Sequence, residues 1–328
     1  MSTEPSLRPG PLDRLLDATV APGFTKVGYV IRSRDFEPLP SGDGKTVVIT
    51  GASTGLGFAT ACDCAASGAS VVMISRDQAR GESARAEVEA RSTGTATVRF
   101  ISCDMSDLDS VRSVATKLAD QLPRIDALVL NAGVLLDERL ITDDGIEMAW
   151  ATNVVGPYLL EHLLLDSLSS AHGRVVVVTS GGAYSERLAM PAVDLTGDVY
   201  KGSAVYARTK RAQIALTELQ GEQFASRNVT VHAVHPGWAD TPGVQSSLPT
   251  FRRFTRPLLR SAEQGADTIS WLVLADQPNT TTGQLWHDRR IRSRNRVPGQ
   301  HESAQERVAL DNEVSRLAGL SDSSDRHS

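Results

Sequence analysis

The sequence predicts an α/β protein built on a single doubly wound parallel sheet of about seven strands. Short valine-rich runs recur along the chain and are apolar nearly throughout, which is typical of strands buried on both faces. Segments of helical length separate these runs, for example residues 58–67 and 108–122. Strands that alternate with helices in this way form a parallel sheet with helices on both faces. The runs lie at residues 46–50, 70–74, 97–101, 126–130, 174–178, 229–234 and 283–287.

The composition is that of an ordinary globular protein. The chain has 328 residues, of which 41% are hydrophobic and 22% charged, enough for a sizeable core. Its net charge of -5 argues against nucleic acid as the main partner. The polar start and the lack of an apolar run of about 20 residues predict a cytoplasmic protein without a transmembrane span. The three cysteines follow no metal or disulfide spacing, so we expect reduced thiols and no metal site.

Two extensions flank a central domain at residues 45–290. In residues 1–44, apolar side chains recur at helical spacing, which predicts a pair of short helices packed on the body. Contact with a membrane surface, or the wall of a substrate tunnel, is the alternative. Residues 291–328 are expected to form a basic connector and a helix near 302–317. Five arginines at residues 289–296 predict a solvated connector, with phosphate or acidic-lipid binding as the alternative.

A glycine-rich turn follows the first predicted strand and precedes a helix. Glycines there let the backbone turn sharply and approach a pyrophosphate without a Cβ in the way. The helix N-terminus then offers unpaired N–H groups to that phosphate. We therefore expect the cofactor to contact Thr50, Gly51, Ser53, Thr54, Gly55, Leu56 and Gly57.

The end of the second predicted strand distinguishes between cofactors. Sheets that bind NAD usually end this strand in a carboxylate that accepts hydrogen bonds from the ribose. Ser75 and Arg76 follow here instead, and a guanidinium pairs well with a 2′-phosphate. The sequence therefore favours NADP(H), with NAD(H) as the alternative, and predicts that Asp77 caps the next helix.

Two further loops follow the third and fourth predicted strands, at the edge where this architecture binds its ligand. Asp104, with Met105 beside it, would accept a hydrogen bond from the adenine amino group. The small residues Asn131, Ala132 and Gly133 would let the nucleotide lie close to the backbone. Taken singly, each loop is equally well explained as a simple turn.

Tyr206 and Lys210 lie four residues apart, which places a phenol and an ammonium group on one face of a helix. A free phenol, with a pKa of about 10, is a poor acid or base at neutral pH. A neighbouring cation stabilises the phenolate and lowers its pKa, as the positive ring of an oxidised nicotinamide also would. Since this spacing is common, the alternative is an exposed helix face.

Six signals in one order along the chain resemble the short-chain dehydrogenase/reductase family over about residues 45–290. They are the glycine turn, NAG, a later asparagine, a serine after the fifth strand, YxxxK and a Pro-Gly loop. The resemblance implies a Rossmann fold. It also implies hydride transfer between NADP(H) and a small carbonyl or alcohol.

The resemblance implies a role for each matching residue. Ser180 would hydrogen-bond the substrate oxygen, and Tyr206 would donate or remove its proton. Lys210 would lower the pKa of Tyr206 and bind the nicotinamide ribose. Asn153 would hold a water that joins Lys210 to solvent. The nicotinamide end of the cofactor would be fixed by Pro236, Gly237 and Thr241.

The segment between Ser180 and Tyr206 is longer than in many family members, since the two residues lie 26 positions apart. It resembles an insertion of the retinol-dehydrogenase-like branch, which implies no particular substrate. Residues 238–263 are expected to form a lid that carries apolar side chains and arginines. They favour a hydrophobic carbonyl substrate with an acidic group, but ordinary loop contacts would explain them equally well. The lid residues are Trp238, Leu248, Phe251, Phe254, Leu258 and Leu259, with Arg252, Arg253, Arg256 and Arg260.

The sequence thus predicts an NADP(H)-dependent oxidoreductase that interconverts a carbonyl and an alcohol. A non-enzymatic NADP(H)-binding sensor or scaffold is the alternative, and the intact set of Ser180, Tyr206 and Lys210 weighs against it. A nucleotide-sugar epimerase is disfavoured, because such relatives usually carry TGxxGxxG. Family members often form homodimers through the helices of Asn153 and Tyr206, a surface that the terminal extensions would block if they packed over it.

Overall fold

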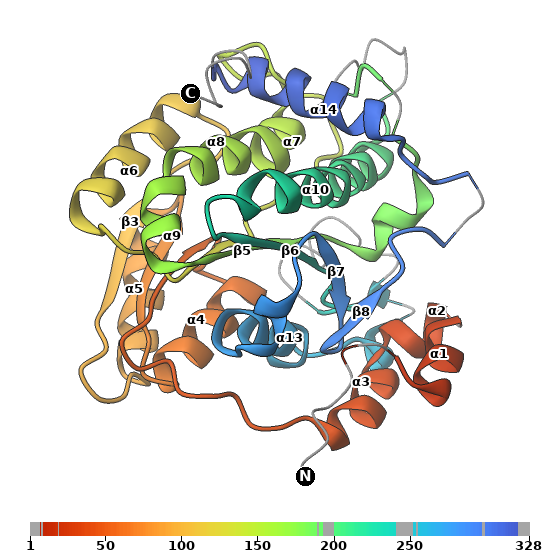
Figure 1. Cartoon of the computed structure of the whole chain (residues 1–328), viewed down its shortest axis with the longest axis horizontal. Coiled ribbons are helices and arrows are strands. Elements are labelled where there is room, and N and C mark those ends of the chain that lie inside the picture. The colour runs from red at the N-terminus through yellow and green to blue at the C-terminus, as the bar shows by residue number, and fades with distance from the viewer. Residues whose placement is uncertain are drawn as a thin grey trace.

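The core of the computed structural model is one eight-stranded sheet (Figure 1). The structure describes residues 7, 9–18, 20–188, 190–192, 200–240, 252–253, 255–296 and 299–320. The strand order is β3-β2-β1-β4-β5-β6-β7-β8, and every neighbouring pair is parallel except β7 with β8. The strands are β1 (Thr46–Thr50), β2 (Ser70–Ser75), β3 (Val98–Ser102), β4 (Ala127–Leu130), β5 (Arg174–Val178), β6 (Thr230–Val234), β7 (Gln284–His287) and β8 (Arg290–Arg292). The predicted fold class is confirmed, with one antiparallel edge strand added.

The strand order reverses at β1. Strands β2 and β3 lie on one side of β1, whereas β4 and all later strands lie on the other. Open α/β sheets bind their ligands at such a switch point, outside the carboxyl ends of the strands. The loops after β1 and β4 therefore border the expected cofactor site.

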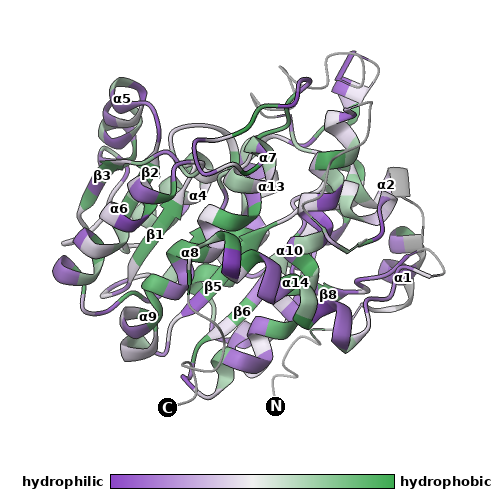
Figure 2. Cartoon of the chain, turned by 90° about the horizontal axis from the view of Figure 1, so that it is seen from above, coloured by the Kyte–Doolittle hydropathy of each residue, from purple (hydrophilic) through white to green (hydrophobic). Residues whose placement is uncertain are grey.

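Alternate strand residues point to opposite faces of the sheet, and each face has its own apolar core. On one face, Val47 and Ile49 belong to the core that includes α4 (Gly55–Ala66), α5 (Gln78–Glu89) and α13 (Ala262–Leu274). On the other face, Val48 and Leu128 belong to the core that includes α6 (Leu108–Gln121), α8 (Gly156–Leu163), α9 (Leu165–Ala171), α10 (Gly202–Ala225) and α14 (Ala304–Leu317). Figure 2 shows the apolar strands in the middle and more hydrophilic residues on the outer helices.

Several short helices lie in the connections between these elements. They are α7 (Met148–Trp150), the π-helix η2 (Ala151–Val155) and the 3-10 helices η3 (Gly181–Ser185), η4 (Arg256–Leu258) and η5 (Gln277–Thr280). Within the part of the chain that the structure describes, no helix is both long and apolar enough to cross a membrane.

The N-terminal extension forms three short helices beside β8, where a pair was expected (Figures 1 and 2). They are α1 (Pro11–Ala18), α2 (Val20–Phe24) and α3 (Lys26–Arg32), and the 3-10 helix η1 (Ser33–Asp35) follows. Phe24, at the end of α2, is only 2% exposed. Arg32 is also buried and pairs with Asp13 and Asp288. The extension is thus anchored by an aromatic side chain and by buried ion pairs.

The arginines after β7 correct an interpretation made from the sequence. Arg289 and Arg292 are buried, and they pair with Asp267 and Asp13 at 2.8 and 2.9 Å. The predicted solvated connector is therefore wrong for these two residues, and they are equally unavailable to a phosphate or a lipid. The reason is strand β8: a tight turn, with positive φ at Asp288 and Arg289, folds the segment back on β7.

Candidate active site

The glycine turn after β1 is locked to the loop after β4. Gly51 and Gly55 have positive φ, which glycine adopts without strain. A Cβ on Gly57 would lie 2.5 Å from the Nδ2 atom of Asn131 and from the carbonyl oxygen of Gly51, so no side chain fits there. Asn131 donates to the carbonyls of Thr50 and Gly51 at 3.0 and 3.2 Å, and the Thr50 hydroxyl accepts from the N–H groups of Asn131 and Ala132. The structure thus brings these predicted cofactor residues together.

The start of α4 differs from the starts of four other helices. Asp77, Asp107, Ser261 and Ser303 cap their helices with a side-chain hydrogen bond, which confirms the predicted cap for Asp77. Thr54, at the same position of α4, makes no such bond. The first N–H groups of α4 therefore lack a side-chain cap, and a pyrophosphate would satisfy them. Ser53 and Leu56 belong to the same turn, so the residues present fit a dinucleotide.

The ends of β2 and β3 bring Arg76 and Asp104 together. The Arg76 side chain is 74% exposed, and its Nη1 atom lies 3.6 Å from the Oδ2 atom of Asp104. The other carboxylate oxygen of Asp104 accepts from the N–H and the hydroxyl of Ser106 at 2.9 and 2.7 Å. Met105 is buried beside it. An exposed cation next to a fixed carboxylate suits the recognition of a phosphorylated ribose and an adenine.

Tyr206, Lys210 and Ser180 meet at the carboxyl end of β5. Tyr206 and Lys210 lie on α10, with the Lys210 Nζ atom 5.5 Å from the centre of the Tyr206 ring. The Nζ atom donates to the carbonyl of Val178 at 2.9 Å. Ser180 begins η3, accepts from the N–H of Gly182 and shares a hydrogen bond with Tyr206. The three predicted catalytic side chains therefore form one group.

Burial shifts the pKa values of this group. It raises the pKa of Tyr206, although the hydrogen bond with Ser180 opposes the shift. It lowers the pKa of Lys210 from 10.5 to about 7. Lys210 is expected to lower the pKa of Tyr206 through its positive charge. In the protein without cofactor, burial disfavours the charged form of Lys210. The expected effect on Tyr206 stays a prediction for the enzyme with its cofactor bound.

Asn153 is fully buried in η2, and its side chain has protein partners. Its amide accepts from the N–H of Val134 and donates to the Val134 carbonyl and to the hydroxyl of Thr209. The backbone carbonyl of Asn153 accepts a hydrogen bond from the side-chain amide of Gln213, which lies one turn beyond Lys210 on α10. Sequence reasoning missed Gln213, although its spacing from Lys210 places it on the same helix face. The water that Asn153 is expected to hold stays a prediction.

Gly133 lies between Asn153 and Lys210. A Cβ on Gly133 would lie 3.3 Å from the Oδ1 atom of Asn153 and 3.4 Å from the Nζ atom of Lys210. The small residue after β4 thus leaves room beside the lysine, where the cofactor ribose is expected.

The Pro-Gly loop after β6 packs on Arg260. Gly237 has positive φ, and a Cβ there would lie 2.4 Å from the Nε atom of Arg260. Arg260 is 1% exposed, donates to the Pro236 carbonyl at 3.3 Å and pairs with Asp288 at 2.6 Å. The sequence also suggested that Arg260 binds an acidic group of the substrate. This interpretation is wrong, because the Arg260 guanidinium is buried and already pairs with Asp288.

Much of the expected lid lies outside the described residues, including Thr241, Leu248, Phe251 and Phe254. Among its described members, Arg252 pairs with Asp240 at 2.8 Å, and Leu258 is 43% exposed.

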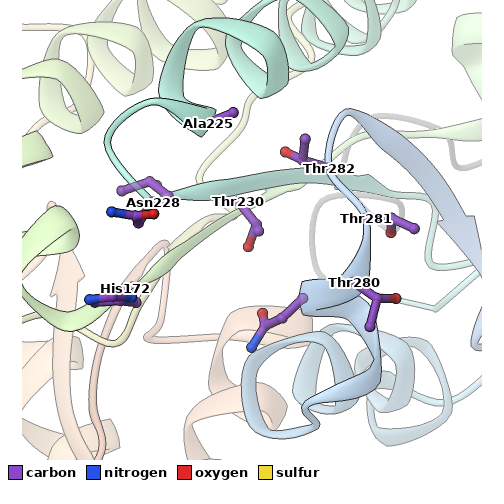
Figure 3. Close-up of a pocket in the computed structure, with 9 residues that line it drawn as sticks. His172, Ala225, Asn228, Thr230, Thr280, Thr281 and Thr282 are labelled. Carbon is purple, nitrogen blue, oxygen red and sulfur yellow. The ribbon is translucent and has the colours of Figure 1, made fainter.

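A hollow of about 520 Å³ lies at the other end of the strands from the group of Ser180, Tyr206 and Lys210 (Figure 3). The turns that precede β5, β6 and β7 form it, with His172, Asn228 and Thr281 among its lining residues. Because these strands are parallel, the hollow is at their amino ends. It is therefore separate from the group of Ser180, Tyr206 and Lys210.

Comparison with known proteins identifies the family. Residues 45–250 match the family model described as short chain dehydrogenase. The chain belongs to the short-chain dehydrogenase family. It is similar to dehydrogenase/reductase SDR family member 12 of Homo sapiens, with 35% identity over 280 residues, 81% of this chain and 84% of that protein.

Two other similarities agree with this assignment. Retinol dehydrogenase 12 of Bos taurus is 35% identical over 249 residues, which cover 75% of this chain and 78% of that protein. A solved short chain dehydrogenase/reductase family protein has a TM-score of 0.60 and 28% identity, and covers 75% of this chain and 96% of its own. This short-chain dehydrogenase is therefore an oxidoreductase of a family that binds NAD(P)(H) and acts on CH–OH and C=O groups.

Proposed function

We propose that this short-chain dehydrogenase uses NADP(H) to interconvert a carbonyl and an alcohol, with Tyr206 as the proton donor and acceptor. The observation that carries the proposal is the group formed by Ser180, Tyr206 and Lys210 at the carboxyl end of β5. This group lies at the same edge of the sheet as the glycine turn, since β1 and β5 are parallel strands of one sheet.

When bound, NADP(H) would supply the hydride that reduces the carbonyl carbon. Ser180 donates a hydrogen bond to the carbonyl oxygen, on which negative charge develops. Tyr206 then transfers its phenolic proton to that oxygen, and the alcohol forms. Lys210, when protonated, stabilises the phenolate that remains. In oxidation, the phenolate of Tyr206 removes the alcohol proton, and the oxidised cofactor, when bound, would accept the hydride.

The residues at the end of β2 support NADP(H) over NAD(H). Arg76 presents an exposed guanidinium where NAD-binding sheets usually carry a carboxylate. The nearest carboxylate after it, Asp77, caps α5 by accepting from the N–H of Arg80 at 2.9 Å. Asp77 is therefore occupied. The Arg76 side chain lies 3.6 Å from Asp104 but is 74% exposed, so its guanidinium can still meet a 2′-phosphate from the surface.

A hydrophobic substrate is supported by the lid and by a relative. The described part of the lid exposes Leu258, and Trp238 is partly exposed. One similar protein is named for retinol, a largely apolar alcohol. We therefore include an apolar aldehyde or ketone in the proposal.

The packing of α14 supports a monomer over a homodimer formed through α8 and α10. Helix α14 contacts both of these helices. The Tyr158 hydroxyl of α8 donates to the Asp311 carboxylate of α14 at 2.7 Å, and this contact is buried. We keep a cytoplasmic location as part of the same proposal.

The test is Tyr206→Phe, with NADPH and a panel of all-trans-retinal, an aromatic ketone and a short polar ketone. Removing a general acid costs about a hundredfold to ten-thousandfold in rate, so we expect kcat to fall about a thousandfold. The Kd for NADPH should stay nearly the same. Tyr158→Phe, which removes a buried phenol from another part of the molecule, is the matched control. Turnover at the wild-type rate in Tyr206→Phe would refute the mechanism. If the wild-type protein bound NADPH tightly but turned over no carbonyl of the panel, the alternative of a non-enzymatic NADP(H)-binding sensor would be favoured.

A further inference from the structure

We propose that the N-terminal extension is part of the active site's framework, with Phe24 as a positioning residue for both the Ser180 loop and the Pro236–Gly237 loop. The proposal rests on the proposed function, because it assigns the nicotinamide half of the cofactor to these two loops. It gives the extension a role that neither the glycine turn nor the catalytic side chains supply.

The ring of Phe24 fills the space between the two loops. Its centre lies 4.3 Å from that of His235, the residue before Pro236, in an edge-on contact. A Cβ on Gly181, the residue after Ser180, would lie 3.1 Å from the Cε2 atom of Phe24 and 3.0 Å from the ring of His235. One apolar side chain of the extension thus supports the residues next to both loops.

The backbone of Phe24 holds the Pro-Gly loop as well. Its carbonyl accepts from the N–H of Trp238 at 2.8 Å and from the Nε atom of Arg260 at 3.1 Å. The N–H of Arg260 donates in turn to the Trp238 carbonyl at 2.8 Å. Residues 236–240 therefore lie between the end of α2 and the segment that carries Arg260. A displacement of Phe24 would therefore displace residues 236–240 as well.

Buried charges fix the extension in this place. Asp288 pairs with Arg260 at 2.6 Å and with Arg32 of α3 at 2.8 Å, and all three are buried. Burial alone would raise the pKa of Asp288, but neighbouring positive charges hold it well below its ordinary value: His287 where it is protonated, in acid, and Arg260 and Arg32 at every pH. Burial lowers the pKa of His287 to about 4, so this histidine is neutral at physiological pH. The ion pairs of Asp288 with Arg260 and Arg32 therefore persist across the neutral pH range.

The extension supports one half of the site only. Figure 1 shows α1, α2 and α3 beside β8, at the edge of the sheet opposite β2 and β3. Arg76 and Asp104, expected at the adenine, follow β2 and β3. A change at Phe24 should therefore affect the nicotinamide end and leave the adenine end unchanged.

Phe24→Leu tests this, with Phe36→Leu as the matched control. Phe36 also belongs to the extension but packs on Tyr29 and Arg289 instead of the two loops. The Kd is measured for NADPH and for adenosine 2′,5′-bisphosphate, which carries the adenine end alone. We expect Phe24→Leu to weaken NADPH about tenfold, because the loops must be ordered on binding, and to leave the bisphosphate unchanged. Phe36→Leu should change neither.

A loss that is equal for both ligands, or no loss for either, would overturn the positioning role while leaving the proposed function intact. Wild-type protein that binds neither ligand would instead contradict the proposed function itself. A second measurement follows hydride transfer in a single turnover with the carbonyl found in the Tyr206 test. Phe24→Leu should slow that step about tenfold, since small misplacements at a reacting centre are costly. An unchanged rate would show that Ser180 is positioned without Phe24.

Discussion

The two ends of the proposed cofactor site differ in how they are built, and one arginine at each end shows the difference. At the adenine end, the side chain of Arg76 is 74% exposed and lies 3.6 Å from its nearest carboxylate. At the nicotinamide end, Arg260 is 1% exposed and binds Asp288, Pro236 and carbonyls of the N-terminal extension. The proposed adenine end is therefore formed by exposed side chains on the surface of the fold. The proposed nicotinamide end is built on buried side chains, and residues of the N-terminal extension are among them.

If this contrast is right, the two arginines differ most in their effect on stability. Arg260→Met should lower the free energy of unfolding by roughly 3 kcal/mol, because it removes a partner from the buried carboxylate of Asp288 and from several buried carbonyls. Arg76→Met should change it by less than about 0.5 kcal/mol, as surface substitutions usually do. Urea unfolding of both variants measures the difference. Equal losses would remove the distinction between the two ends.

The buried lysine at the nicotinamide end should make stability depend on pH. Burial lowers the pKa of Lys210 from 10.5 to about 7, so between these values the unfolded chain binds a proton that the folded chain lacks. The contribution of Lys210 to the free energy of unfolding therefore rises with pH across this window. Lys210→Met should stabilise the protein most below pH 7, by on the order of a few kcal/mol, and the gain should shrink towards pH 10.5. Unfolding midpoints near pH 6 and near pH 10 measure it. The same gain at both would mean that folded Lys210 keeps its proton.

The sequence was sufficient for the seven strands β1 to β7, for the cap at Asp77 and for the meeting of Arg76 with Asp104, because these features follow from local pattern and strand order. Each of the seven predicted runs is a strand, since an apolar run of that length is buried wherever the helices pack. The cap at Asp77 needs only residues of its own turn. Arg76 and Asp104 meet because parallel strands end at one edge.

The sequence predicted residues of the nicotinamide end but not the buried contacts that hold them, because these contacts join distant parts of the chain. Arg260 and Phe24 are 236 residues apart, and Arg32 and Asp288 are 256 apart. No local pattern pairs such residues, so the arginines were interpreted as exposed. Strand β8 was missed for a related reason: a run of arginines is polar by composition, and only distant acidic partners allow it to be buried.

The smallest expected effect tests what Arg76 does at the surface. Arg76→Met should weaken NADPH about tenfold, because it removes a charge-assisted hydrogen bond to the 2′-phosphate at a site open to water. NADH, which has no 2′-phosphate, should bind as before, so the preference between the two cofactors narrows. Arg80→Met is the matched control, since Arg80 is also exposed and lies near Asp77 one turn along α5. Binding titrations with both cofactors measure the change. If NADPH and NADH weakened together, Arg76 would be contributing to general attraction of the nucleotide, and the cofactor preference would have to come from another residue.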